Sequence, residues 1–144
     1  MPVLKQTLDI DAPPHEVWRV LTTPELVREW AAAYQDGISI RTSWREGEQV
    51  TWKAPDGETR ASGTVAAFRP ERLLKFDYTE AVATENRSFS EEFEIQPGPA
   101  GAVLNFTSGP FDEDAFQALK GPAEDAIREI KSLAEESAQI HGLR

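Results

Sequence analysis

The sequence predicts an α+β fold in which a curved antiparallel sheet of about seven strands wraps around one long C-terminal helix. Three observations predict it. One alternating segment near the N-terminus is followed at once by two short helical segments, short alternating segments fill the middle of the chain, and a long apolar stripe of helical period closes it. With 144 residues, we expect a single domain over residues 1–144, with one hydrophobic core.

The first strand and the two helices after it are predicted from alternation and from helix-start residues. Residues 4–10 alternate between apolar and polar side chains, as a half-buried strand does. Asp11 or Ala12 can cap the first helix, with Pro13 in its first turn, and Thr23 can cap the second. Each helix is too short to persist alone in water, so each must press its apolar face onto the sheet.

The middle of the chain has the pattern of a β-sheet. Short groups of Gly, Pro and Asp residues divide it into six alternating segments. We expect strands at residues 38–44, 49–54, 59–68, 73–78, 86–96 and 102–108. Because the turns between them are short, the strands should pair mostly antiparallel.

The helical period returns after Gly109-Pro110 and continues almost to the C-terminus. Because proline fits poorly inside a helix, we expect the main helix to begin at Pro122 and residues 111–120 to form a separate lead-in. His141-Gly142 should end it. This helix is the one element long enough to cover the apolar face of the sheet, and a cavity can form between the two.

Composition excludes several classes of function. With 25 acidic and 15 basic residues the net charge is -10, which repels phosphate backbones, so we expect no nucleic-acid partner. No apolar run approaches ~20 residues, which predicts no membrane insertion. The absence of cysteine and of a signal-like apolar run suggests a reducing cytoplasm.

No metal ion or cofactor is expected either. The two histidines, His15 and His141, lie far apart in the sequence and are expected to have surface roles. In the acidic cluster, strand alternation places Glu92 and Glu94 on one face and Glu91 on the other, so the three carboxylates cannot hold one ion.

Several short motifs occur in a fixed order along nearly the whole chain. They are Ala12-Pro13, Val17-Trp18, Leu21-Thr22-x-Pro24-Glu25 and Trp30, then Gly63-x-Val65, Pro70, Leu74 and Phe76, and finally Ser108-Gly109-x-Phe111. In this order and spacing the chain resembles the START-like, SRPBCC-type helix-grip domains, whose fold is that of the birch-pollen allergens. Within them it resembles the branch named for the activator of heat-shock-chaperone (heat shock protein 90) ATPase, C-terminal-domain type.

The resemblance implies a helix-grip fold with a ligand cavity, and it raises a chaperone as a partner. In the eukaryotic namesake, chaperone stimulation depends on a preceding N-terminal domain, for which we expect no room in 144 residues. The family usually opens the last helix with a Gly-Trp pair, whereas this chain has Gly121-Pro122, so one large side chain near the cavity is missing.

The candidate ligand-binding residues are mostly aromatic and fall on the predicted inner face of the sheet or the helices. They are Trp30, Trp44, Trp52, Phe76, Tyr78, Phe89, Glu91, Phe106, Phe116 and Ile127. These side chains can line one apolar cavity with a phenol at its mouth. They can equally be ordinary core, as aromatic strand residues usually are.

Glu91 stands out because it shares a strand face with Phe89 and Phe93, where a carboxylate is costly unless it is hydrated or paired. Two interpretations follow. Glu91 is either a polar anchor for a ligand, partnered by Arg87, or one half of a strand-end ion pair, the commoner arrangement.

We therefore expect the protein to bind a small hydrophobic or amphipathic molecule, such as a lipid, between the sheet and the C-terminal helix. One alternative is an enzyme in which Tyr78, Glu91 or Arg87 polarises the ligand, as the cyclase, aromatase and hydrolase branches of the superfamily imply. The other is a protein-interaction module of the co-chaperone kind, which needs a large exposed apolar patch. The oligomeric state is left open, with a homodimer as one alternative.

Overall fold

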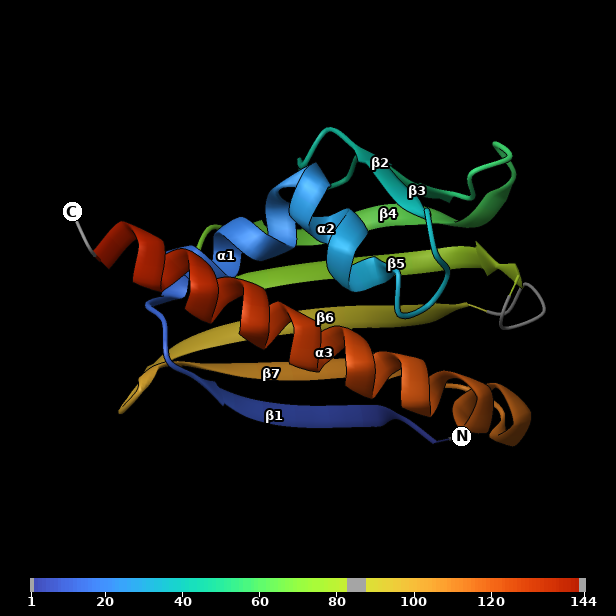
Figure 1. Cartoon of the computed structure of the whole chain (residues 1–144). Coiled ribbons are helices and arrows are strands. Elements are labelled where there is room, and N and C mark those ends of the chain that lie inside the picture. The colour runs from blue at the N-terminus through green and yellow to red at the C-terminus, as the bar shows by residue number, and fades with distance from the viewer. Residues whose placement is uncertain (1, 83–87, 143–144) are drawn as a thin grey trace.

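A seven-stranded antiparallel sheet, covered on one face by three helices, makes up the fold of the computed structural model (Figure 1), which describes residues 2–82 and 88–142. The elements are β1 (Leu4–Ile10), α1 (Pro14–Thr22), α2 (Pro24–Ala31), β2 (Ser39–Thr42), β3 (Gln49–Lys53), β4 (Thr59–Arg69), β5 (Leu73–Ala81), β6 (Phe89–Gly98), β7 (Gly101–Gly109) and α3 (Glu113–Gly142). The strand order is β1-β7-β6-β5-β4-β3-β2, so β1 pairs with the last strand and the others pair with their neighbours in sequence. The predicted α+β class and antiparallel sheet are confirmed.

The strand predictions hold with local differences. β2 ends at Thr42, two residues before the predicted end, because Trp44 has a φ of 59°, which an extended strand cannot contain. β5 continues to Ala81, three residues beyond the predicted end, because it keeps pairing with β4. The predicted start of the sixth middle strand, at residues 86 and 87, lies outside the described residues.

The two short helices follow β1 as predicted, but the first one starts later. Pro13 occupies the N-cap position and Pro14 the first turn of α1, so neither Asp11 nor Ala12 caps it. Thr23 is the N-cap residue of α2 as predicted, although its side chain makes no capping hydrogen bond.

The prediction that the last helix begins at Pro122 is wrong. α3 is continuous from Glu113 to Gly142, with Pro122 inside it. Proline removes one N–H and thereby leaves the Ala118 carbonyl without its helical partner, a cost of about 3 kcal/mol. The first turns are held in place by buried Phe111 and Ala115 and by the Asp112 side chain, which accepts a hydrogen bond from the Ala115 N–H at 2.8 Å.

The sheet is covered by all three helices rather than by α3 alone. α3 packs against β1, α1 and α2, while α1 packs on β6 and β7 and α2 packs on β2 (Figure 1). Seven strands about 4.8 Å apart form a surface roughly 29 Å wide, whereas one helix is only about 10–12 Å across. The prediction that only the long helix can cover the sheet is therefore wrong, because α1 and α2 cover part of it.

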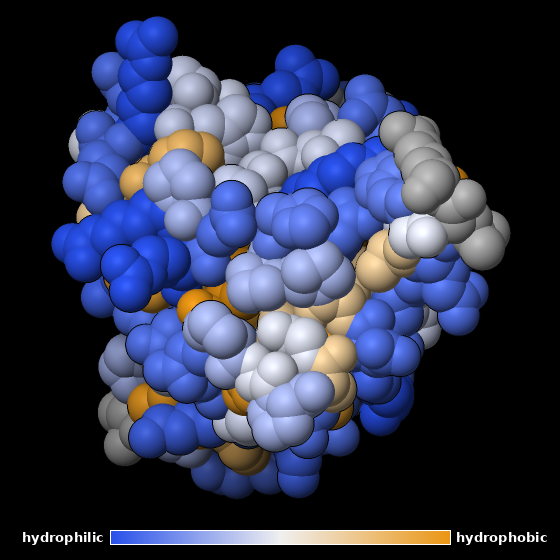
Figure 2. Space-filling view, turned by 90° about the vertical axis from the view of Figure 1, so that its left-hand side faces the viewer, coloured by the Kyte–Doolittle hydropathy of each residue, from blue (hydrophilic) through white to orange (hydrophobic). Residues whose placement is uncertain are grey.

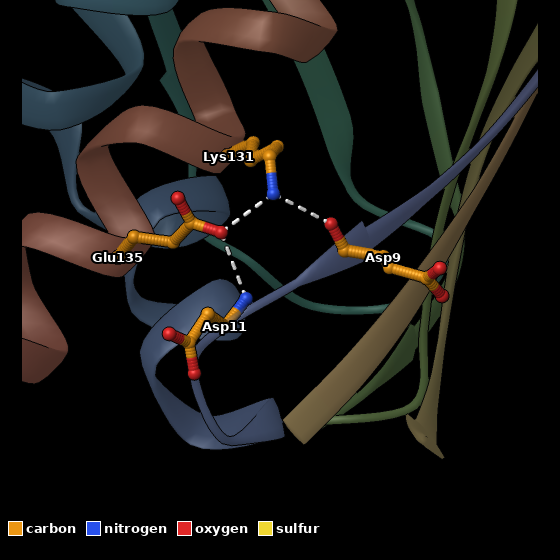
Figure 3. A network of polar contacts seen from close by, with 4 residues as sticks. All are labelled: Asp9, Asp11, Lys131 and Glu135. Atoms are coloured by element: carbon orange, nitrogen blue, oxygen red, sulfur yellow. Dashed lines mark hydrogen bonds and ion pairs between the residues drawn. The ribbon is translucent and has the colours of Figure 1, made fainter. Parts of the chain in front are cut away.

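A polar network fixes α3 to the end of β1 (Figure 3). Lys131 Nζ donates to the Asp9 carbonyl at 2.8 Å and to the Glu135 carboxylate at 2.6 Å, and the Asp11 N–H donates to the same Glu135 oxygen at 2.8 Å. Burial raises the pKa of Glu135, but the hydrogen bonds from Lys131 and Asp11 outweigh it and lower that pKa below its ordinary value.

A second set of polar contacts joins α3 to α1. His141 Nδ1 lies 2.6 Å from the Glu16 carboxylate, which is only 2% exposed, and Arg19 donates to the Ser137 hydroxyl at 2.6 Å. His141 itself is 37% exposed, so this surface residue has a buried structural partner.

Candidate functional site

A cavity of about 340 Å³ opens between the sheet, the segment after α2 and the first half of α3. Its lining residues are Leu4, Trp30, Ala31, Tyr34, Gln35, Ile38, Trp52, Arg60, Ala61, Tyr78, Ala81, Val82, Phe89, Glu91, Ser108, Phe111, Ala118, Leu119 and Pro122. Most of these side chains are apolar or aromatic, and a few polar groups project among them. This combination is typical of small-molecule sites.

The polar groups in the wall form a chain of hydrogen bonds. Trp52 Nε1 donates to the Tyr78 hydroxyl at 2.8 Å, and that hydroxyl donates to Glu91 Oε1 at 3.3 Å. All three residues are buried, at 7%, 3% and 8% exposed. Because the chain ends on a carboxyl group, Glu91 is the member that can exchange a proton with a ligand.

Burial shifts the acid-base behaviour of this chain. It raises the pKa of Glu91 from 4.5 to about 7, although the hydrogen bond from Tyr78 lowers it in part. The pKa values of Tyr34 and Tyr78 lie well above 10.0, first because of burial and then because of the Glu91 charge. Near neutral pH, Glu91 can therefore give or take a proton while both phenols remain neutral donors.

Glu91 has no ion-pair partner among residues 2–82 and 88–142. The strand-end ion pair that the sequence suggested is thus not found there. Arg87, its suggested partner in the interpretation as a ligand anchor, lies outside the described residues.

Arg60 contributes a cation to the cavity wall. Its Nε atom is buried and makes no hydrogen bond to any described residue, and no other buried side-chain nitrogen or oxygen of those residues lacks a partner. An unpaired buried N–H costs about 1–3 kcal/mol, so this atom is a natural position for a ligand acceptor.

The position of Tyr78 depends on a close approach of two strands. Gly63 pairs with Tyr78 at a register shift in β4, and a Cβ atom at Gly63 would lie 2.0 Å from the Asp77 carbonyl oxygen. A side chain at this position would push β5 away and move the phenol. The Gly63-x-Val65 motif therefore has a structural explanation next to the cavity.

The model of the family described as "Polyketide cyclase / dehydrase and lipid transport" matches residues 1–135. The chain belongs to this family. The polyketide cyclase/dehydrase and lipid transport family has the START-like, SRPBCC helix-grip fold, which is a ligand-binding fold. No curated protein matches the chain.

Solved structures show the same fold at low sequence identity. Protein MLL2253 from Mesorhizobium loti superposes with a TM-score of 0.76 at 20% identity, over 94% of this chain and 98% of that one. An AHSA1-like protein from Aeromonas hydrophila gives 0.73 at 15% identity, over 94% of each chain. CalU16 from Micromonospora echinospora gives 0.70 at 20% identity, over 92% of this chain and 64% of that one.

In this member of the polyketide cyclase/dehydrase and lipid transport family, five of the ten candidate residues line the cavity together. They are Trp30, Trp52, Tyr78, Phe89 and Glu91. The Trp30 indole donates to the Val20 carbonyl at 3.1 Å, so its N–H anchors α2 on α1 while its ring faces the cavity.

The other five candidates lie elsewhere. Phe76 and Ile127 are fully buried core residues, and Phe106 and Phe116 line a second hollow between β1 and α3. Trp44 packs against Phe68, with ring centroids 6.2 Å apart. The structure therefore divides the aromatic set between cavity and core, the two alternatives that the sequence left open.

Of the 19 lining residues, the fourteen that are not Trp30, Trp52, Tyr78, Phe89 or Glu91 were absent from the candidate list, and three of them show which signals were missed. Phe111 stands in the Ser108-Gly109-x-Phe111 motif, which could have identified it. Tyr34 follows Trp30 by four residues and so shares its side of the chain, although α2 has already ended. Arg60 gave no sequence signal, because a charged residue at the start of a strand is ordinarily solvated.

Within residues 2–82 and 88–142, no three His, Asp or Glu side chains come together as metal ligands would. No helix in the described part of the chain is long and apolar enough to cross a membrane.

Proposed function

We propose that this protein binds a small hydrophobic or amphipathic molecule in the cavity between the sheet and α3. The observation that carries the proposal is a cavity of about 340 Å³ with mainly apolar and aromatic walls and a buried chain of hydrogen bonds from Trp52 through Tyr78 to Glu91. The apolar wall supplies affinity and the few polar groups orient the ligand. Membership of a family described by lipid transport supports the same class of ligand.

A second candidate is an enzyme that transfers protons, of the cyclase or hydrolase kind. One observation favours it. Glu91 has a pKa of about 7, which suits a general acid or base at neutral pH, and the Tyr78 hydroxyl donates a hydrogen bond to it. A reaction would show a pH–rate profile that follows Glu91 and is lost in Glu91→Gln, whereas passive binding would turn over no substrate.

A chaperone-interacting module has less support. The large apolar side chains that are exposed in the described part of the chain are Val3, Val82 and Ile140. Val3 precedes β1, Val82 follows β5, and Ile140 lies near the end of α3. On the end of the molecule seen in Figure 2, hydrophilic residues surround small apolar spots instead of one broad apolar surface. Interaction surfaces usually present a larger contiguous patch.

The binding proposal is tested with a neutral apolar dye, N-phenyl-1-naphthylamine. We expect saturable enhancement of the dye's emission together with quenching of tryptophan emission, because Trp30 and Trp52 line the cavity. Ala61→Phe should weaken binding by about tenfold or more by filling the cavity, since 1.4 kcal/mol already gives that factor.

Ala66→Phe is the matched control, because Ala66 is an exposed residue on the same strand. It should bind the dye like the unchanged protein, and thermal melting should show that both variants fold. The binding proposal is wrong if the dye and a panel of fatty acids and sterols all fail to bind, or if both variants bind alike.

A further inference from the structure

The polar groups of the cavity lie at two separated levels along the sheet. Arg60 precedes Ala61, which pairs with Ala81, whereas Tyr78 lies three residues from Ala81 along β5. At about 3.3 Å per residue, the backbone of Tyr78 lies about 10 Å along the strands from the level of Ala61, and the backbone of Glu91, which pairs with Phe76, lies about 17 Å from it. The polar side chains reach toward one another between these levels, because Trp52, which pairs with Ala61, donates to the Tyr78 hydroxyl and that hydroxyl donates to Glu91. One end of the cavity therefore carries a cation and the other a carboxyl–phenol pair.

The Arg60 guanidinium can bind an anionic oxygen of a ligand. The buried Nε of Arg60 has no partner among the described residues, and no acidic side chain of those residues lies within 4.0 Å of its guanidinium. A guanidinium is always charged, and its planar fork matches a carboxylate in a bidentate pair. This charge stands out in a chain whose net charge is -10.

The inner end suits an uncharged oxygen group. The hydrogen-bond chain runs from Trp52 through Tyr78 to Glu91 Oε1, which leaves Glu91 Oε2 for a ligand. A protonated carboxyl donates from that oxygen to a carbonyl or hydroxyl, and an ionised one accepts from a hydroxyl. A second anionic group of the ligand would be repelled at this position by the Glu91 carboxylate when Glu91 is ionised.

Apolar side chains fill the distance between the two ends. Trp30, Phe89, Phe111 and Leu119 line the cavity, and the rings of Phe89 and Phe111 lie 5.0 Å apart. This wall fits a flexible or aromatic hydrocarbon body rather than a sugar or a peptide.

We infer that the ligand is an extended amphipathic monoanion, with a carboxylate at Arg60, an apolar body along the aromatic wall and an uncharged hydroxyl or carbonyl oxygen at Glu91. The inference rests on the proposed function and narrows it to hydroxylated or oxidised medium-chain acids. Arg60 selects for the anion, and the Tyr78–Glu91 pair selects for the oxygen at the far end of the chain.

Calorimetric titration of the unchanged protein with 10-hydroxydecanoate, decanoate and 1-decanol tests both ends at once. We expect 10-hydroxydecanoate to bind most tightly and 1-decanol most weakly. Arg60→Met should weaken both acids by about tenfold or more, because a charge-assisted hydrogen bond is lost, and should leave 1-decanol within about twofold. Glu91→Leu should remove the advantage of 10-hydroxydecanoate over decanoate.

Arg41→Met is the matched control, since Arg41 is an exposed residue on β2 and its loss changes the net charge equally. It should leave all three affinities unchanged. If 1-decanol binds as tightly as decanoate to the unchanged protein, the inference is overturned while the proposed binding function stands. If none of these compounds binds and the neutral dye does not bind either, both fail together.

Discussion

Truncation after Gly121 is expected to unfold the protein. The deleted part of α3 carries Ile127, Ile130 and Ala134, all no more than 1% exposed, and the contacts from His141 and Ser137 to α1. Burying each large side chain contributes about 1.5–3 kcal/mol, against a net stability of ~5–15 kcal/mol for a typical domain. Size-exclusion chromatography and thermal melting by circular dichroism should show an aggregated or loosely folded product.

Single substitutions in α3 measure the contribution of this helix to stability in a protein that still folds. Ile130→Ala should lower the free energy of unfolding by roughly 2–5 kcal/mol, because it leaves a cavity in a close-packed core. Glu129→Ala, one residue earlier on the exposed side, should have little effect. A fragment of residues 1–121 that melts cooperatively would contradict the structural role given to α3.

Glu91 is expected to make the protein less stable as the pH rises. The pKa of Glu91 is about 7 in the folded protein and 4.5 in the unfolded chain, so between these values the folded state binds more protons. The contribution of Glu91 to the free energy of unfolding is then fully present below about pH 4.5. It is lost as the pH rises to about 7, which lowers the free energy of unfolding by on the order of 3 kcal/mol. Glu91→Gln removes the titration, and the variant should be more stable than the unchanged protein at pH 8.

Urea unfolding at pH 4.5 and pH 8 checks this prediction. The quantity compared is the difference in the free energy of unfolding between the variant and the unchanged protein. Glu92→Gln is the matched control, because the neighbouring carboxyl faces the other side of β6. Its difference should not change with pH. If the difference for Glu91→Gln is also independent of pH, the Glu91 carboxyl is hydrated and the cavity is open to water at this point.

Most of the fold could be predicted because alternation and helical period record burial directly. Residues 4–10 became β1, and the six middle segments became β2 to β7. Pro122 was misjudged because a local penalty was weighed without the packing that offsets it, which comes from Phe111, Ala115 and the Asp112 cap. The φ of Trp44 could not be foreseen, because no local signal marks a left-handed tryptophan.

The candidate site could be predicted only in part, for a different reason. Strand alternation placed Tyr78 and Glu91 on the inner face, but it could not show that Trp52 would reach across β4 to the Tyr78 hydroxyl. The role of Arg60 depends on its missing partner, which is a property of the three-dimensional arrangement. Residues outside the sheet, such as Tyr34 after α2 and Leu119 in α3, meet the sheet only through the global packing.

The four tryptophans can show whether a ligand occupies this cavity, because two line it and two do not. Trp30 and Trp52 are in its wall, whereas Trp18 and Trp44 pack against Phe68, with ring centroids 5.1 and 6.2 Å away. In a ¹⁵N–¹H correlation spectrum titrated with 10-hydroxydecanoate, the indole signals of Trp30 and Trp52 should shift and saturate together while those of Trp18 and Trp44 stay in place. Equal shifts at all four indoles, or shifts confined to Trp18 and Trp44, would contradict binding in this cavity.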